Sequence, residues 1–193
     1  MKRTVTLALL IVAFYFTGYY LIGIGFVPDN FTEARRQGAL IAKDIVKSAE
    51  ESLARLSEIS EADRRNRFNK ALELVRAELD QAQESRKKAI SLTAELDKMA
   101  RSAAGIKPVK ARNVVMEAVG HEVSLITHLI VYNDVLNSLL QTLVLKFSGD
   151  LKDNTSVQAL IETMNGETKE INKLNDLYNQ KMKLFDDLVR NSS

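Results

Sequence analysis

The sequence predicts an all-α protein with an N-terminal transmembrane helix followed by an up-and-down antiparallel bundle of four long helices. Three observations support this fold class. Residues 4–27 form one apolar run without a charge. The rest of the chain repeats apolar residues at spacings of three and four, which is the period of one helix face. The whole chain also holds only two Pro and eight Gly, so helix breakers are scarce. We assign residues 1–28 to the anchor and residues 29–193 to the helical-bundle domain.

The run over residues 4–27 has the length of a membrane span. Its roughly 24 residues would form a helix about 36 Å long, and a bilayer core is about 30 Å thick. Proline disfavours helix at the preceding residue, so Val27-Pro28 marks the end of the span. A signal peptide cleaved before Phe26 is the alternative, but the apolar part of such peptides is usually about 7–15 residues long. We therefore favour a single-pass signal anchor that is retained.

Charges on the two sides of the span predict its orientation. Lys2 and Arg3 precede the span, and Asp29 and Glu33 are the first charges after it. The positive-inside rule then places the N-terminus in the cytoplasm and the body of the chain in the periplasm or its equivalent. Arg35 and Arg36 follow closely and weaken the asymmetry. A body facing the cytoplasm remains the alternative.

Composition narrows the possible functions. The net charge is +2, and Lys2 and Arg3 account for that excess. Residues 29–193 therefore lack the excess of basic residues that is typical of nucleic-acid binding. The chain has no Cys, which excludes disulfides, thiolate metal sites and cysteine catalysis. No phosphate-binding glycine loop and no Ser/His/acid spacing is present. We expect no cofactor and no enzymatic activity.

The apolar spacing predicts helices over residues 31–59, 61–104, 108–147 and 155–190. Asn30 with Glu33 resembles a capping box at the first start. A second cap signature begins at Ser60 and predicts a tight reversal there, although one uninterrupted helix over 31–103 is the alternative. Gly105 suits the position after a helix end, and Pro108 suits the first turn of the next helix. The third helix has the broadest apolar face, which is typical of a central bundle helix.

One segment resembles a known family. Residues 147–154 read Phe-Ser-Gly-Asp-Leu-Lys-Asp-Asn and are followed by Leu160, Ile171 and the pair Tyr178-Asn179. This pattern, mainly within residues 147–190, is similar to the C-terminal half of LemA-family proteins. Gly149 stands where that family has a proline, and residues 57–107 show no match. The resemblance implies a membrane-anchored helical bundle and brings no catalytic residues.

Two histidines are the only candidates for a metal or haem site. His121 and His128 lie seven residues apart, on one side of the third predicted helix, and Glu117 lies one turn before His121. The spacing does not match the Glu-x-x-His pattern of di-iron bundles. We therefore favour packing of both rings at the edge of the core over a ligand role, and we predict no metal site.

Two charges fall on predicted apolar seams. Glu122 lies on the seam of the third helix, and Arg86 lies on that of the second, which also runs through Phe68, Leu72, Val75 and Leu79. A lone buried charge is unfavourable, so each should find a partner. Folding the chain about residues 148–155 brings Glu122 level with Lys181, and folding about 105–108 brings Arg86 near His128. We predict a structural polar core with a Glu122–Lys181 pair and with Arg86 close to His128 or reaching solvent. A polar ligand pocket is the alternative to this register-fixing role.

These observations favour a structural, scaffolding or protein-interaction component of the cell envelope without catalysis. Its expected partners are the lipid bilayer, through the N-terminal helix, and other envelope proteins or further copies of the chain. The alternative is an extracytoplasmic ligand-sensing four-helix bundle.

Overall fold

The computed structural model describes residues 26–150 and 155–191, and all of its regular structure is helical. Helix α1 covers Asp29–Arg64, α2 covers Phe68–Ser102, α3 covers Val109–Phe147 and α4 covers Thr155–Arg190. A short 3-10 turn, η1, covers Ala103–Gly105 between α2 and α3. The predicted anchor over residues 4–27 lies almost wholly outside the described residues. Among the described residues, one helix, α3, is long and apolar enough to cross a membrane by those two criteria.

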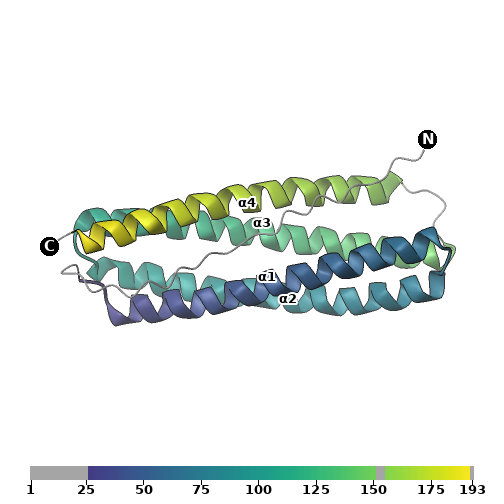
Figure 1. Ribbon diagram of the computed structural model, residues 1–193, viewed down its shortest axis with the longest axis horizontal. Helices are drawn as coiled ribbons and strands as arrows, with labels where there is room; N and C mark the ends of the chain where they lie inside the picture. Colours follow the sequence, from purple (N-terminus) through teal and green to yellow (C-terminus); the bar gives the residue numbers. More distant parts are fainter. Residues whose placement is uncertain (1–25, 151–154, 192–193) are drawn as a thin grey trace.

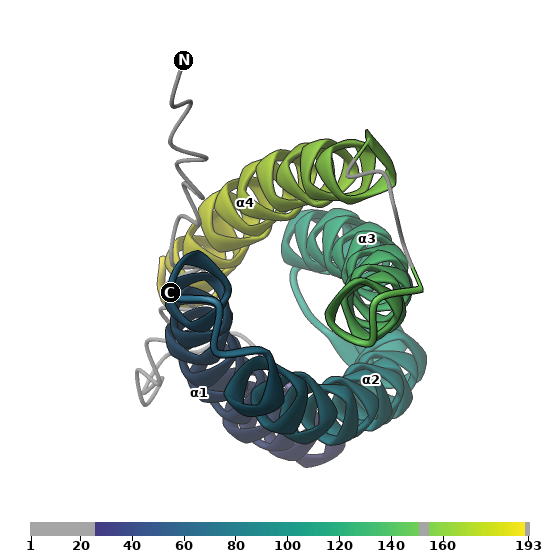
Figure 2. The ribbon, with the colours of Figure 1, turned by 90° about the vertical axis from the view of Figure 1, so that its right-hand side faces the viewer.

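The helices form an up-and-down array, as predicted (Figure 1). Close backbone packing joins α1 to α2, α2 to α3 and α3 to α4. Seen end-on, the array curls so that α4 approaches α1 (Figure 2). The start of α1, the α2–α3 connection and the end of α4 share one end of the bundle, which we call the terminal end. The end of α1, the start of α2, the end of α3 and the start of α4 lie at the opposite, distal end.

The reversal between the first two helices lies later than predicted. Ser60 is inside α1, which continues to Arg64, so the cap signature at Ser60 does not start a helix. Its acidic member Glu61 instead pairs within the same helix end, with Arg64 and Arg65. The break falls at residues 65–67, which decides between the two alternatives in favour of two separate helices.

Two distal helix ends close with the same hydrogen-bond pattern. After α1, the amides of Asn66 and Arg67 donate to the carbonyls of Asp63 and Ala62, at 3.0 and 2.9 Å. Gly149 and Asp150 repeat this arrangement after α3, donating to residues 146 and 145 at 3.2 and 2.9 Å. Such a motif requires a left-handed residue after the helix, and Asn66 (φ 54°) and Gly149 (φ 85°) supply it. Asn and Gly adopt that conformation most readily.

The terminal end differs from the prediction in two details. Helix α1 begins at Asp29 after Pro28, and Glu33 accepts hydrogen bonds from Arg36 and Gln37, so the predicted Asn30–Glu33 capping box is not formed. Gly105 ends the η1 turn without a positive φ. A Cβ placed on Gly105 would lie 2.9 Å from Pro28 Cγ, so this glycine permits a close approach of residues 26–28 to the α2–α3 connection. The amide of Lys107 donates to the carbonyl of Phe26 beside it, at 3.0 Å.

The core consists of two apolar clusters stacked along the bundle. The terminal cluster is centred on large buried side chains of all four helices, among them Phe31, Leu92, Val115 and Phe185. The distal cluster holds residues such as Ile59, Val75, Leu140 and Met164. Most of the buried polar side chains lie near the middle of the helices, where the two clusters meet, whereas Glu122, Asn175 and Asp186 lie towards the terminal end.

Candidate functional site

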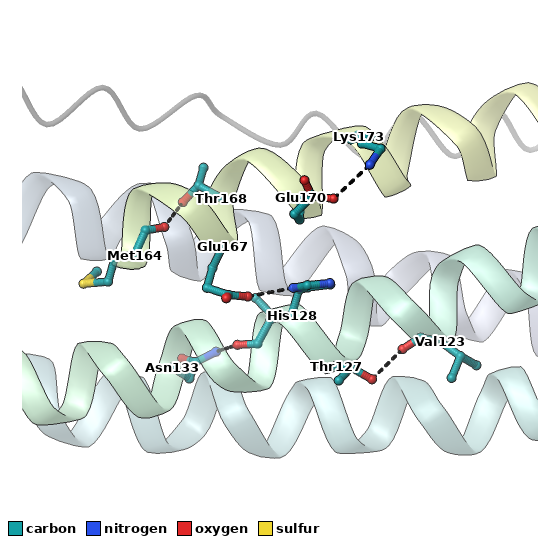
Figure 3. A network of polar contacts seen from close by, with 10 residues as sticks. Val123, Thr127, His128, Asn133, Met164, Glu167, Thr168, Glu170 and Lys173 are labelled. Carbon is teal, nitrogen blue, oxygen red and sulfur yellow. Dashed lines mark hydrogen bonds and ion pairs between the residues drawn. The ribbon is translucent and has the colours of Figure 1, made fainter. Parts of the chain in front are cut away.

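We call the polar residues between the two apolar clusters the central polar layer. Its buried members come from all four helices: Ser48, Ser52, Glu78, Asn133 and Thr168. The small hydroxyls and amide are satisfied locally. Thr168 donates to the carbonyl of Met164 at 2.9 Å and Asn133 to that of Leu129 at 2.8 Å (Figure 3). The Ser48 hydroxyl donates to the backbone carbonyl of Asp44 at 2.9 Å and accepts a hydrogen bond from the Lys88 ammonium at 2.8 Å.

Glu78 is the charged centre of this layer. Its side chain is fully buried on α2, yet both carboxylate oxygens accept hydrogen bonds from α1. Ser52 donates to one oxygen, and the Arg55 guanidinium donates to the other at 2.5 Å. Burial and the nearby Glu78 raise the pKa of the Tyr132 hydroxyl on α3. These two contacts tie α1 to α2.

A histidine–carboxylate pair joins α3 to α4 at the same level. The Nδ1 atom of His128 lies 2.7 Å from Oε2 of Glu167, and both side chains remain partly exposed (Figure 3). The pair borders the layer rather than lining a buried site. An imidazole held in this way is fixed in orientation.

Glu122 is the exception among the buried carboxylates. It lies on α3 within the terminal apolar half, its exposed fraction is 0%, and neither oxygen has a hydrogen-bond partner among the described residues. Burial raises the pKa of its carboxyl from 4.5 to about 8. The group is therefore neutral at pH 7, because an ionised carboxylate without a partner is strongly disfavoured in an apolar core.

Glu122 lies close to the place where α4 meets α1. Tyr178 of α4 is buried near it, and burial followed by the charge of Glu122 raises the pKa of the Tyr178 hydroxyl. Towards the terminal end, Arg35 of α1 donates two hydrogen bonds to Asp186 of α4, at 2.7 and 2.9 Å. The Arg35 guanidinium also lies 5.9 Å from the centre of the Phe185 ring, which packs on Phe31 at 5.5 Å.

The predicted Glu122–Lys181 pair is wrong. Lys181 donates to Glu117 at 2.5 Å instead, and the hydrogen bond lowers the pKa of the Glu117 carboxyl. The prediction assumed a symmetrical reversal about residues 148–155. The pairing of Lys181 with Glu117, five residues earlier than Glu122, shows that α4 is displaced along α3 by about 8 Å, so the end of α3 projects past the start of α4 (Figure 1). Glu122 belongs to the core, as predicted, but Lys181 is a partly exposed residue at its edge.

Arg86 is also outside the core. Its side chain is 50% exposed and its Nε atom lies 3.2 Å from Asp134, so it reaches solvent, which was one of the two predicted outcomes. The contact with His128 does not form, because His128 faces Glu167 of α4.

The three metal-ligand candidates, Glu117, His121 and His128, do not meet at one site. Glu117 is engaged by Lys181 and His128 by Glu167, while His121 is half-buried beside Glu117. Among residues 26–150 and 155–191, no group of three His or acidic side chains is arranged to hold a metal ion.

Sequence reasoning missed Glu78, and the cause is a rotated choice of helix face. The predicted seam of the second helix ran through Phe68, Leu72, Leu79 and Arg86. The buried line instead runs through Ala71, Val75, Glu78, Ala82 and Leu92. Both lines contain the residues at a spacing of seven, Val75, Ala82, Ala89, Leu96 and Ala103. Between these shared positions, the buried line uses the residue one place before the one that was predicted, such as Glu78 in place of Leu79. The larger Leu72 and Leu79 favoured the wrong line, although they are only partly buried.

No known relative adds information about this site. No protein-family model matches the chain, and no curated protein and no solved structure matches it significantly.

Proposed function

We propose that this chain is a membrane-anchored helical bundle that acts as a structural, scaffolding or protein-interaction component of the cell envelope, without catalysis. One observation carries the proposal. The start of α1 lies at the terminal end of the bundle, together with the end of α4, directly after the apolar run of residues 4–27. A span formed by that run would hold the bundle by its terminal end. Helices of this length would then carry the distal end about 54 Å from the membrane.

The interior of the bundle supports a structural role. The central polar layer is satisfied by internal hydrogen bonds, and its partners lie on neighbouring helices or one turn away on the same helix. Networks of this kind fix register between helices. The similarity to LemA-family proteins, which are anchored bundles, belongs to the same proposal. Because Lys2 and Arg3 precede the span, we further propose from the positive-inside rule that the helical bundle faces the periplasm.

Fractionation of cells producing the full-length chain tests the anchor. We expect the protein in the membrane pellet, resistant to high salt and carbonate and released by detergent. The paired substitution Ile11→Arg with Ala13→Arg should move it to the soluble fraction, because each arginine at the centre of a span adds about 2.5–3.5 kcal/mol. The matched control is Ser91→Arg with Ala94→Arg on exposed positions of α2, which should remain in the pellet. A wild-type chain that is soluble after cell lysis would refute the proposal.

Cross-linking in intact membranes, followed by identification of the joined proteins, tests the scaffolding role. We expect the same protein partners to be recovered reproducibly through exposed sites on the bundle. A protein that joins no other chain in native membranes would contradict a scaffolding role while leaving the anchor untouched.

A second candidate function is that of an extracytoplasmic ligand-sensing bundle, and Glu122 is the observation that favours it. An unpaired carboxyl in the core is a potential anchor for a cationic ligand. Small organic amines screened at millimolar concentration should then raise the melting temperature of wild type and leave Glu122→Gln unchanged. Equal effects on both proteins would remove this candidate.

A further inference from the structure

The outward face of α3 carries an apolar stripe that the bundle leaves open. Ten large hydrophobic residues are exposed in the described part of the chain, and five of them lie on α3, whereas the others are divided among α1, α2, α4 and Phe26. We call these five residues the α3 stripe. They are Val109, Met116, Val123, Val131 and Leu145, which are 56%, 43%, 44%, 39% and 48% exposed. Their spacings of 7, 7, 8 and 14 residues place them on one face of the helix along its whole length.

Two exposed hydroxyls in the central part of the stripe already have hydrogen-bond partners within α3. Ser124 donates to the carbonyl of Gly120 at 3.1 Å, and Thr127 donates to that of Val123 at 3.1 Å (Figure 3 shows the second bond). The carboxylates that border the central part, Glu117 and Asp134, pair with Lys181 and Arg86 of neighbouring helices. Between these two carboxylates, α3 exposes no residue with a formal charge. The central part of the stripe therefore presents an apolar surface with no unmet hydrogen-bonding demand.

Gly120 lies in the middle of this surface and has no intramolecular explanation. It is exposed inside a long helix, and a Cβ placed on it would meet nothing within 4 Å. Glycine weakens a helix interior relative to alanine, but it leaves room for a close approach by another helix at this position. The same helix is apolar enough to cross a membrane, yet only 39% of its most apolar window is buried inside the bundle. Helix α3 therefore has more apolar side chains than the core of the bundle buries.

We propose that the α3 stripe is the interface with a second copy of this chain, formed by parallel packing of α3 against α3 of its partner. This inference rests on the proposed anchor, because copies held in one membrane by their terminal ends stand parallel. A two-fold axis along the bundle then brings each stripe residue opposite its own counterpart. In that arrangement each of the five apolar stripe residues meets its own counterpart and Gly120 meets Gly120, whereas the exposed Asp134, which pairs with Arg86, lies on the same face between Val131 and Leu145. Exposed positions 109, 113, 116, 120, 123 and 127 also follow the alternating spacing of left-handed helix pairs.

The size of the stripe fits an association that depends on the membrane. A face about 54 Å long and about 10 Å wide buries roughly 500 Å² on each copy. The total of roughly 1,000 Å² lies at the lower end of specific interfaces. Such a dimer is weak in solution, but confinement of both copies to one membrane raises their effective concentration. A bilayer fits the stripe less well, because the ion pairs Asp134–Arg86 and Glu117–Lys181 lie on the stripe or beside it.

Single cysteines test the geometry, since the natural chain has none. Met116→Cys and Leu145→Cys are separated by about 44 Å along α3. In a parallel dimer both variants should form disulfide-linked dimers when membranes containing the full chain are oxidised. An antiparallel pair cannot bring both positions to their counterparts, so it would link at most one of them. Ile90→Cys on α2 is 52% exposed and is the matched control, which should remain monomeric.

A charge within the stripe tests its contribution. Val123→Lys places two ammonium groups opposite each other in the dimer and should reduce cross-linking through Met116→Cys at least tenfold, while Ile90→Lys should leave it unchanged. Both positions are exposed, so the melting temperature of either variant should stay within a few degrees of wild type. Cross-links to other proteins in place of dimers, or vesicle binding as the sole property lost in Val123→Lys, would overturn the proposal. Fractionation of the same samples separates the two proposals: a soluble chain refutes the anchor, whereas an anchored chain without dimer cross-links refutes this interface.

Discussion

At the residue scale, the two fully buried glutamates predict opposite responses to neutralisation. Glu122 has no partner and a carboxyl pKa of about 8 when folded, against 4.5 as its reference value. The folded state therefore keeps a proton that the unfolded state releases above pH 4.5. The free energy of unfolding should fall as pH rises from 4.5 to about 8, by of the order of 1 kcal/mol per pH unit, and level off above pH 8.

Urea denaturation at pH 5, 7 and 9 measures this dependence. In Glu122→Gln the group cannot ionise, so most of the loss of stability between pH 5 and pH 8 should disappear. The control Glu117→Gln changes an exposed carboxyl on the same helix and should keep the wild-type slope. A slope that survives in Glu122→Gln would mean that other groups cause the pH dependence and that Glu122 does not have the raised pKa.

Glu78 should behave in the opposite way. Both of its oxygens accept hydrogen bonds, from Ser52 and Arg55, so Glu78→Gln leaves the Arg55 guanidinium without its counter-charge. We expect the free energy of unfolding to fall by about 2–3 kcal/mol at pH 7. The control Glu73→Gln lies on the same helix with its side chain 71% exposed, and it should change stability by no more than about 0.5 kcal/mol. Equal effects of the two substitutions would exclude a buried ion pair.

At the element scale, the helix count and topology were predictable because a spacing of three and four persists over each helix. The ends of α3 and α4 were predicted closely, since Phe147 precedes a glycine turn and Arg190 ends the apolar pattern. The α1–α2 reversal was misplaced because its left-handed residue is Asn66 rather than glycine. The residue pair predicted between α3 and α4 was wrong, because side-chain packing sets the displacement of α4 along α3. The apolar spacing within each helix does not predict that displacement.

Two glycines in different elements give a matched test of helix termination. Gly149 has a φ of 85°, so Gly149→Ala forces a side chain into the left-handed region and should lower stability by about 1 kcal/mol. Gly166 lies in the interior of α4 with open space around it, so Gly166→Ala should raise stability by about 0.5–1 kcal/mol. Thermal melts of both variants measure the pair. A loss at position 166 would indicate that this glycine makes a close contact outside the described residues.

At the scale of the whole molecule, the curl of the array depends on contacts between its first and last helices. The side-chain contacts described between α1 and α4 gather at the terminal end, in the Phe31–Phe185 pair and the Arg35–Asp186 ion pair. Local sequence patterns predict each helix face but not which faces meet across 150 residues of chain. The predicted polar core therefore contained Glu122 and lacked Arg35 and Asp186.

Truncation of Phe185 tests whether this junction closes the bundle. Its side chain is fully buried against Phe31 and under the Arg35 guanidinium. Phe185→Ala should therefore lower the free energy of unfolding by about 3–5 kcal/mol. The adjacent Leu184 is 42% exposed, and Leu184→Ala should change it by less than about 1 kcal/mol. Hydrogen exchange should show the first turns of α1 losing protection in Phe185→Ala before the α2–α3 pair does, because α1 would then be held mainly by α2. Uniform loss of protection in all four helices would show instead that the bundle unfolds as one cooperative unit and that the α1–α4 junction has no separate role.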